Sequence, residues 1–212
     1  MANKSLILGV VALCTVPAAT QAQQVLINEN FNELTPALGV MDVGAFHTTG
    51  GSNVDILGPG AGTFPELCVA PTEVNCIDLG GTGGNPLGVL QSKTEFTLQP
   101  GVEYHLSFDL IGSERAGDVT ATTVSFGPYT QTFNLQPGDT TSGVVTNKEI
   151  TVSTPTTAFL TFSSDSIDPF NVGSILDNVV LTSSSAPEPA TLGLMVLGLL
   201  GGAGFAGRRR RN

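Results

Sequence analysis

Residues 102–110 alternate strictly between apolar and polar side chains, and this pattern limits the possible folds more than any other feature of the chain. The apolar members would share one face of a β-strand, because successive side chains of a strand point to opposite faces; they are Val102, Tyr104, Leu106, Phe108 and Leu110. Strict alternation over this length is typical of a strand with one buried face. We therefore expect this segment to lie in a sheet that covers a core.

Further candidate strands occur along most of the chain between its two ends. Two Thr-rich segments, 119–126 and 129–135, flank Gly127-Pro128 and predict a hairpin or tight connection. The other candidates are residues 25–31, 43–47, 89–98, 144–152, 158–163 and 174–182. Pro100-Gly101 suits the central positions of a type II turn. Since no segment here shows helical periodicity, we predict an all-β fold, an antiparallel β-sandwich (jelly roll).

The first 22 residues have the features of a secretory signal peptide. Lys4 makes the first residues weakly basic, and residues 6–16 form an apolar stretch. Thr20-Gln21-Ala22 has the small-x-small pattern of a cleavage site that is cut after Ala22. We expect the exported chain to begin at Gln23.

An uncharged apolar segment, residues 190–207, lies near the other end of the chain. As a helix it reaches about 27 Å, close to the thickness of a bilayer's hydrocarbon core, which is about 30 Å. It follows Pro187-Glu188-Pro189 and precedes four arginines, Arg208, Arg209, Arg210 and Arg211, which favour the cytoplasmic side. The pattern predicts a β-sandwich at 23–182, a linker at 183–189, a transmembrane helix at 190–207 and a basic cytoplasmic tail at 208–212.

The order Pro-Glu-Pro, apolar helix, arginine cluster resembles the PEP-CTERM sorting signal of Gram-negative bacteria. This resemblance implies recognition by an exosortase, a membrane-embedded cysteine transpeptidase that is expected to cut near Pro187-Glu188-Pro189. It further implies an inner-membrane-anchored precursor that becomes a cell-surface or extracellular protein. An ordinary tail anchor that stays in the membrane is the alternative.

The segment between the two ends is strongly acidic. Of the 18 Asp and Glu residues of the chain, only Glu188 lies outside residues 23–186, and the only bases there are Lys93, Arg115 and Lys148. Such a surface repels nucleic acid and anionic lipid, so neither is an expected partner. The chain has no Trp, which leaves few side chains for an aromatic platform that stacks on sugars.

Two cysteines remain after the predicted signal peptide, Cys68 and Cys76, with seven residues between them. Export would place them in an oxidising compartment, so we predict that they form a disulfide. The alternative is a metal pair, but two sulfurs with no His nearby in the sequence are too few for a zinc site.

The first and last predicted strands show a second resemblance. The sequences Asn-x-x-Phe at residues 28–31 and Leu-Asp-Asn-Val at 176–179 are similar to the first and last strands of galactose-binding-like jelly rolls. Such domains often hold a structural Ca²⁺ between these strands. The resemblance implies that Glu29 and Asp177 supply the carboxylates and that Asn28 or Asn30, together with main-chain carbonyls, completes an oxygen shell. The alternative is that Glu29 is solvated and Asp177 only shapes a strand edge.

No catalytic motif is recognisable, so we predict a protein that is not an enzyme. The leading hypothesis is a structural or adhesive component of the extracellular matrix or biofilm, in contact with exopolysaccharide. The alternative is a non-catalytic carbohydrate-binding module.

Overall fold

The computed structural model describes residues 23–60, 64–68, 74–82, 88–115, 117, 119–137, 148–165 and 172–184. All of them belong to one unit that extends from Ala22 to Ala186. The predicted signal peptide, the Pro187-Glu188-Pro189 segment, the predicted transmembrane helix and the predicted basic tail lie outside the described residues. Within these residues, no helix is long and apolar enough to cross a bilayer.

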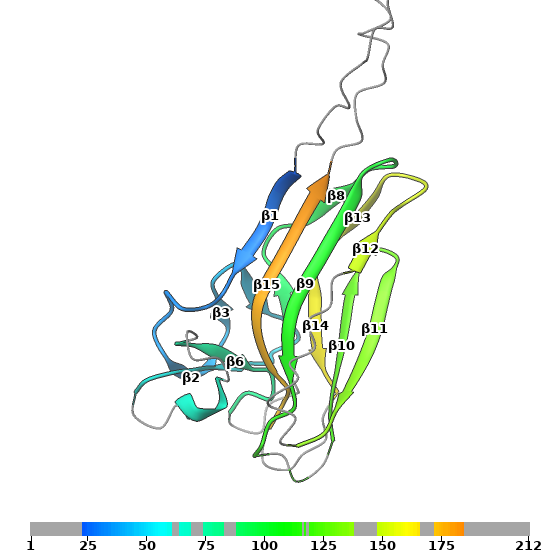
Figure 1. Ribbon diagram of the computed structural model, residues 1–212. Helices are drawn as coiled ribbons and strands as arrows, with labels where there is room; N and C mark the ends of the chain where they lie inside the picture. The colour runs from blue at the N-terminus through cyan, green and yellow to red at the C-terminus, as the bar shows by residue number, and fades with distance from the viewer. Residues whose placement is uncertain are drawn as a thin grey trace, which may run out of the picture. The chain divides into compact units, whose positions relative to one another are not determined.

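The larger of two main sheets has seven antiparallel strands. Six follow one another in the order β12 (Lys148–Ile150), β9 (Glu103–Ile111), β15 (Ile175–Ser184), β6 (Cys76–Asp78), β5 (Val54–Leu57) and β2 (Ala37–Val40). The seventh, β1 (Gln23–Glu29), also pairs with β15, so the first and last strands of the domain lie side by side (Figure 1). The two ends of the domain meet there, because Gln23 pairs with Ser184.

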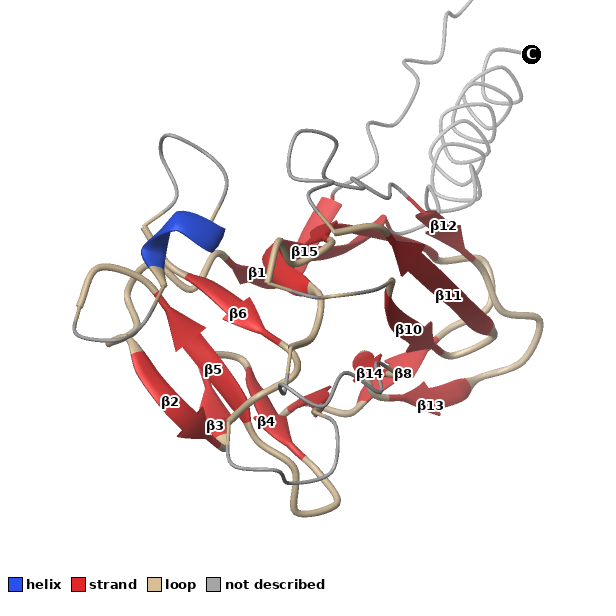
Figure 2. Ribbon diagram, turned by 90° about the horizontal axis from the view of Figure 1, so that it is seen from below, coloured by secondary structure: helices blue, strands red, loops and turns tan. Residues whose placement is uncertain are grey.

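The second sheet has six antiparallel strands. Their order is β11 (Tyr129–Leu135), β10 (Thr120–Phe126), β14 (Thr161–Ser164), β7 (Val89–Ser92), β4 (Phe46–Thr48) and β3 (Asp42–Val43). A short third sheet pairs β13 (Thr156–Ala158) with β8 (Phe96–Leu98), and one 3-10 turn, η1, covers Pro65–Leu67. Figure 2 shows the strands around a common interior. The predicted all-β antiparallel sandwich is therefore confirmed.

Aromatic rings connect the two main sheets across the core. Phe108 of β9 packs edge-on against Phe162 of β14 and Phe133 of β11, with centroids 5.3 and 5.6 Å apart. Phe46 of β4 packs edge-on against Phe162 at 6.1 Å. Such edge-to-face pairs contribute about 0.5–1.5 kcal/mol each beyond the burial of their area. The alternating segment that predicted β9 thus supplies a central part of this core.

A second apolar cluster lies apart from the main core and contains the disulfide. Cys68 and Cys76 are bonded, with their Cα atoms 5.5 Å apart, which confirms the predicted pairing. Cys76 is fully buried, and the cluster also includes Leu57, Leu67, Ile111 and Ile175. The disulfide therefore holds η1 close to strands β5 and β6.

Three predicted strands are each two strands in the structure. Residues 43–47 turn at Gly44, whose φ is +54°, and form the β3–β4 hairpin. Residues 89–98 are interrupted after Ser92, so that β7 and β8 belong to different sheets. Residues 158–163 are divided in the same way between β13 and β14. Glycine at Gly44 adopts the positive φ without the steric cost that a side chain brings.

Candidate functional site

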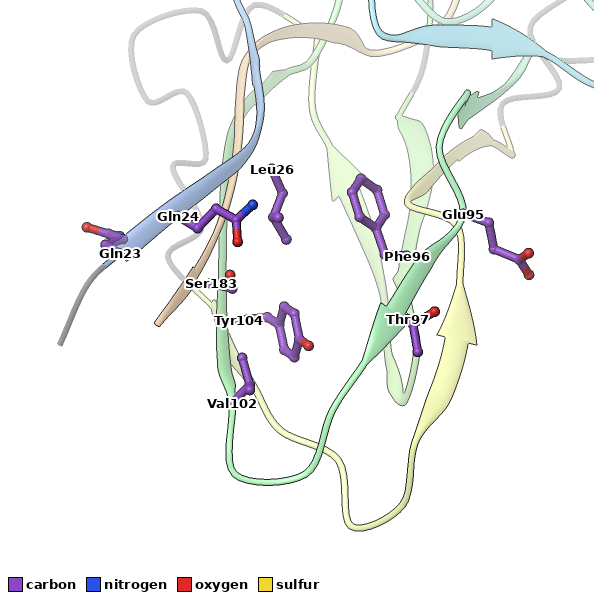
Figure 3. Close-up of a pocket in the computed structure, with 9 residues that line it drawn as sticks. All are labelled: Gln23, Gln24, Leu26, Glu95, Phe96, Thr97, Val102, Tyr104 and Ser183. Atoms are coloured by element: carbon purple, nitrogen blue, oxygen red, sulfur yellow. The ribbon is translucent and has the colours of Figure 1, made fainter. Parts of the chain in front are cut away.

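A pocket of about 510 Å³ lies between β1, β8, β9 and the end of β15 (Figure 3). Its size falls in the range of about 300–1,000 Å³ that small-molecule sites usually have. The lining combines apolar and polar side chains: Gln23, Gln24, Leu26, Glu95, Phe96, Thr97, Val102, Tyr104 and Ser183.

Two aromatic side chains form the fixed part of this pocket. Phe96 and Tyr104 both pack edge-on against Phe126, at centroid distances of 5.8 and 6.1 Å. The hydroxyl of Tyr104 accepts a hydrogen bond of 2.8 Å from the backbone N–H of Gln99. That bond spans the Pro100-Gly101 turn, where the φ of Gly101 is +77°, as a type II turn requires. Ring contacts and the turn together hold Tyr104 in place.

The polar side of the pocket carries one charged side chain at neutral pH, that of Glu95. In Figure 3 the side chains of Leu26, Phe96 and Tyr104 point toward the gap, whereas the carboxylate of Glu95 points away from it. Gln23 donates a hydrogen bond of 2.8 Å to Thr182, which fixes the start of β1 against β15. The arrangement can hold a small amphipathic molecule, but it offers no pair of carboxylates for acid–base chemistry.

The amino-acid sequence alone does not predict this pocket. The alternation in residues 102–110 does place Tyr104 on the inner face. However, only the break of the chain after Ser92 sets Phe96 on a separate strand beside it. The polar run Lys93-Thr94-Glu95 in an otherwise strand-like segment was the available signal.

A second, more open pocket of about 410 Å³ lies where β11 and β12 come together. The Lys148 ammonium sits 5.7 Å from the centroid of the Tyr129 ring, within range of a cation–π contact. Gln131 and Glu149 also line this pocket.

Two buried aspartates form the most unusual electrostatic feature of the described residues. Asp55 of β5 lies directly opposite Asp78 of β6, and both are at least 97% buried. One Asp78 oxygen accepts hydrogen bonds from the backbone N–H groups of Gly80 and Gly173, at 2.8 and 2.9 Å, and the other has no hydrogen-bond partner among the described residues.

The surroundings of Asp78 oppose its ionisation. Burial raises the pKa of Asp78 to about 7, and the nearby Asp55 charge adds to the rise, whereas the two amides and Arg115 oppose it. Asp55 accepts hydrogen bonds from the Gly39 N–H, at 2.7 Å, and from the Thr82 hydroxyl, at 2.5 Å. Both carboxyls thus bind the surrounding loops and strands.

The residues of the predicted Ca²⁺ site have protein partners. The Glu29 carboxylate accepts hydrogen bonds from the backbone N–H groups of Phe31, at 3.0 Å, and Ala45, at 2.9 Å. Asn28 is exposed, and the Asn30 side chain accepts a bond from the Asn32 N–H.

Asp177 lies in a bulge of β15 and is buried. It accepts a bond from the N–H of Asn178, whose φ is +50° and whose amide donates to Asp109. In the register of β1 and β15, Glu29 pairs with Val179, two residues from Asp177. The described residues contain no group of three or more His, Cys, Asp or Glu side chains placed to hold a metal. Calcium binding remains a prediction, which melting curves with and without a chelator would test.

Comparison with protein families identifies a sorting motif in this chain. A scan against protein families matches residues 185–211 to the PEP-CTERM protein-sorting motif. A search of curated proteins finds no match.

Among solved structures, the chain is similar to the CBM22-1–GH10 modules of the Clostridium thermocellum endo-1,4-beta-D-xylanase 10B, complexed with xylohexaose. The identity is 13% and the TM-score 0.46, and the match covers 78% of this chain and 29% of that chain. The chain therefore joins an antiparallel all-β domain to a PEP-CTERM protein-sorting motif at residues 185–211, which marks it as an exported protein that is sorted to the cell envelope.

Proposed function

We propose that this protein is an exosortase substrate that acts at the cell surface or in the extracellular matrix, where it has a structural or adhesive role in a biofilm or exopolysaccharide. The observation that carries the proposal is the sorting motif at residues 185–211. The signal peptide at 1–22 would start export, and the helix at 190–207 would hold a precursor in the inner membrane. The all-β domain would then be the part that is delivered.

Each part of the tail has a separate physical task in this proposal. The apolar segment can rest in the bilayer because the backbone polar groups of a helix are satisfied within it. The four arginines keep the far end in the cytoplasm. Pro187 and Pro189 lack a backbone N–H, so they keep the chain extended and open to a processing enzyme. Glu188 adds one charge that such an enzyme could recognise.

Replacement of Pro187-Glu188-Pro189 by alanines tests the proposal. We expect the variant to enter the membrane as the wild type does but not to be released, so that the full-length chain accumulates there. A blot of membrane and medium fractions, with a tag in the domain, measures this. The matched control replaces Arg208–Arg211 by alanines and should instead impair retention or orientation. Release of the first variant at the wild-type rate would show that the tail is only an anchor.

A non-catalytic carbohydrate-binding module is the second candidate. The pocket between β1 and β8 favours it, because apolar and uncharged polar side chains line the same space. Retention of the full chain, purified in detergent, on insoluble polysaccharides would support this function. Turnover of any of those polysaccharides would contradict our prediction that the protein is not an enzyme.

A further inference from the structure

We propose that the pocket between β1 and β8 binds an uncharged saccharide. The inference rests on the carbohydrate-binding candidate above and deepens it, because it assigns a site and a class of ligand.

The apolar part of the pocket fits the non-polar face of a sugar ring. Leu26 of β1, Phe96 of β8 and Tyr104 of β9 border one space together with Val102, which directly precedes β9. Phe96 is half-buried, and its ring contact with Phe126 fixes its position. A pyranose ring presents C–H groups on its faces, and such a face gains free energy when it leaves water for an apolar surface. Because the rings are already held, little conformational entropy is lost on binding.

The polar part of the pocket has side chains that are available to form hydrogen bonds with a ligand. The side chains of Gln24 and Thr97 line the pocket and are exposed. Among the described residues, neither side chain has a hydrogen-bond partner. An amide offers two donors and an acceptor, and a hydroxyl offers one donor and two acceptors. These groups match the hydroxyls on the edge of a sugar ring.

The charges of the lining residues favour an uncharged saccharide over an acidic one. No lining residue carries a positive charge, and Glu95 carries a negative one. The segment between the predicted signal peptide and the sorting motif also has 17 acidic residues and only three Lys and Arg residues, so its net charge is negative. A uronic acid or a sulfated sugar would meet repulsion without a compensating ion pair.

Calorimetric titration of the full chain in detergent tests the inference. The probes are cello-, xylo- and galacto-oligosaccharides, and an alginate oligosaccharide is the acidic comparison. We expect at least one uncharged probe to bind and the acidic one not to bind. The Gln24→Ala, Thr97→Ala double variant should bind that probe about tenfold more weakly, since it loses two hydrogen-bonding groups. Asn134→Ala, an exposed polar change on β11, is the matched control and should bind normally.

Three results would overturn the inference. Unchanged affinity in the double variant, with an unchanged melting temperature, would place the saccharide elsewhere and leave carbohydrate binding itself intact. Tighter binding of alginate than of any uncharged probe would show that the class of ligand is wrong. Lack of binding to every probe would overturn both the site and the carbohydrate-binding candidate. The fractionation test of sorting is independent of all three.

Discussion

The buried carboxyl of Asp78 makes the stability of the domain depend on pH in an unusual direction. Most carboxyls in folded proteins are stabilised as anions, and their proteins lose stability in acid. Asp78 is fully buried opposite Asp55, and its pKa is raised to about 7. Between the ordinary pKa of 3.8 and about 7, the folded state therefore holds a proton that the unfolded state has lost.

We predict that this carboxyl lowers the free energy of unfolding as the pH rises from about 4 to 7. Across that window the slope approaches about 1.4 kcal/mol per pH unit, and above pH 7 it flattens because both states are ionised. Asp78→Asn keeps an oxygen that can accept the amides of Gly80 and Gly173 but does not titrate. Urea unfolding of the wild type and the variant at a series of pH values measures the difference.

The variant should show a flatter profile and should gain stability relative to the wild type as the pH approaches 7. Asp42→Asn is the control, because Asp42 is exposed and pairs with Lys93 at the surface. Parallel profiles for wild type and Asp78→Asn would show that Asp78 is ionised in the folded state throughout.

Individual residues show how much of the candidate sites can be predicted from the sequence alone. The inward position of Tyr104 follows from the alternation around it, and the pairing of Cys68 with Cys76 follows from export. Asp78 gives no such signal, because an acidic residue next to Leu79-Gly80 resembles an exposed turn. One of the two amides that donate to it belongs to Gly173, which lies 95 residues away in the sequence.

At the level of strands, alternation predicts what lies at the interface of the two sheets. The long strand β9 and the β10–β11 hairpin were predicted correctly, because one face of each strand is buried more deeply than the other. Strands β5 and β6 were missed. Every residue of both is buried, since the main core covers one face and the cluster with the disulfide covers the other. Strands buried on both faces lose the alternation on which the prediction depends.

The disulfide next to these strands gives a prediction at the same scale. A bond that closes a loop this short removes conformational entropy from the unfolded chain, which in the chain-entropy model contributes about 2–3 kcal/mol. We expect the Cys68→Ala, Cys76→Ala double variant to lose about this much free energy of unfolding, plus the packing that Cys76 provides. Urea unfolding without reductant measures the loss.

Addition of reductant should lower the stability of the wild type and leave the double variant unchanged. If reductant had no effect on either protein, the disulfide would not stabilise the fold.

On the scale of the whole domain, assembly depends on the last strand to be synthesised. β15 lies between β9 on one side and both β6 and β1 on the other. Its buried residues Leu176, Val179 and Leu181 belong to the main core. Without β15 the larger sheet is divided, and three strands lose a neighbour.

We predict that a chain that ends at Gly173 does not fold, whereas a chain that ends at Ala186 does. The longer chain should unfold cooperatively on heating, followed by circular dichroism, and the shorter one should show no transition. A cooperative transition in the shorter chain would mean that the sandwich forms without its central strand.

The pairing of Gln23 with Ser184 also determines how the domain would respond to mechanical load. A pull on the chain beyond Ser184 acts along the axis of β15. The hydrogen bonds to β9 and β1 run across that axis, since antiparallel ladders are perpendicular to their strands. They are therefore sheared together rather than unzipped one after another. A domain tethered through this strand would resist flow with the bonds of two ladders at once.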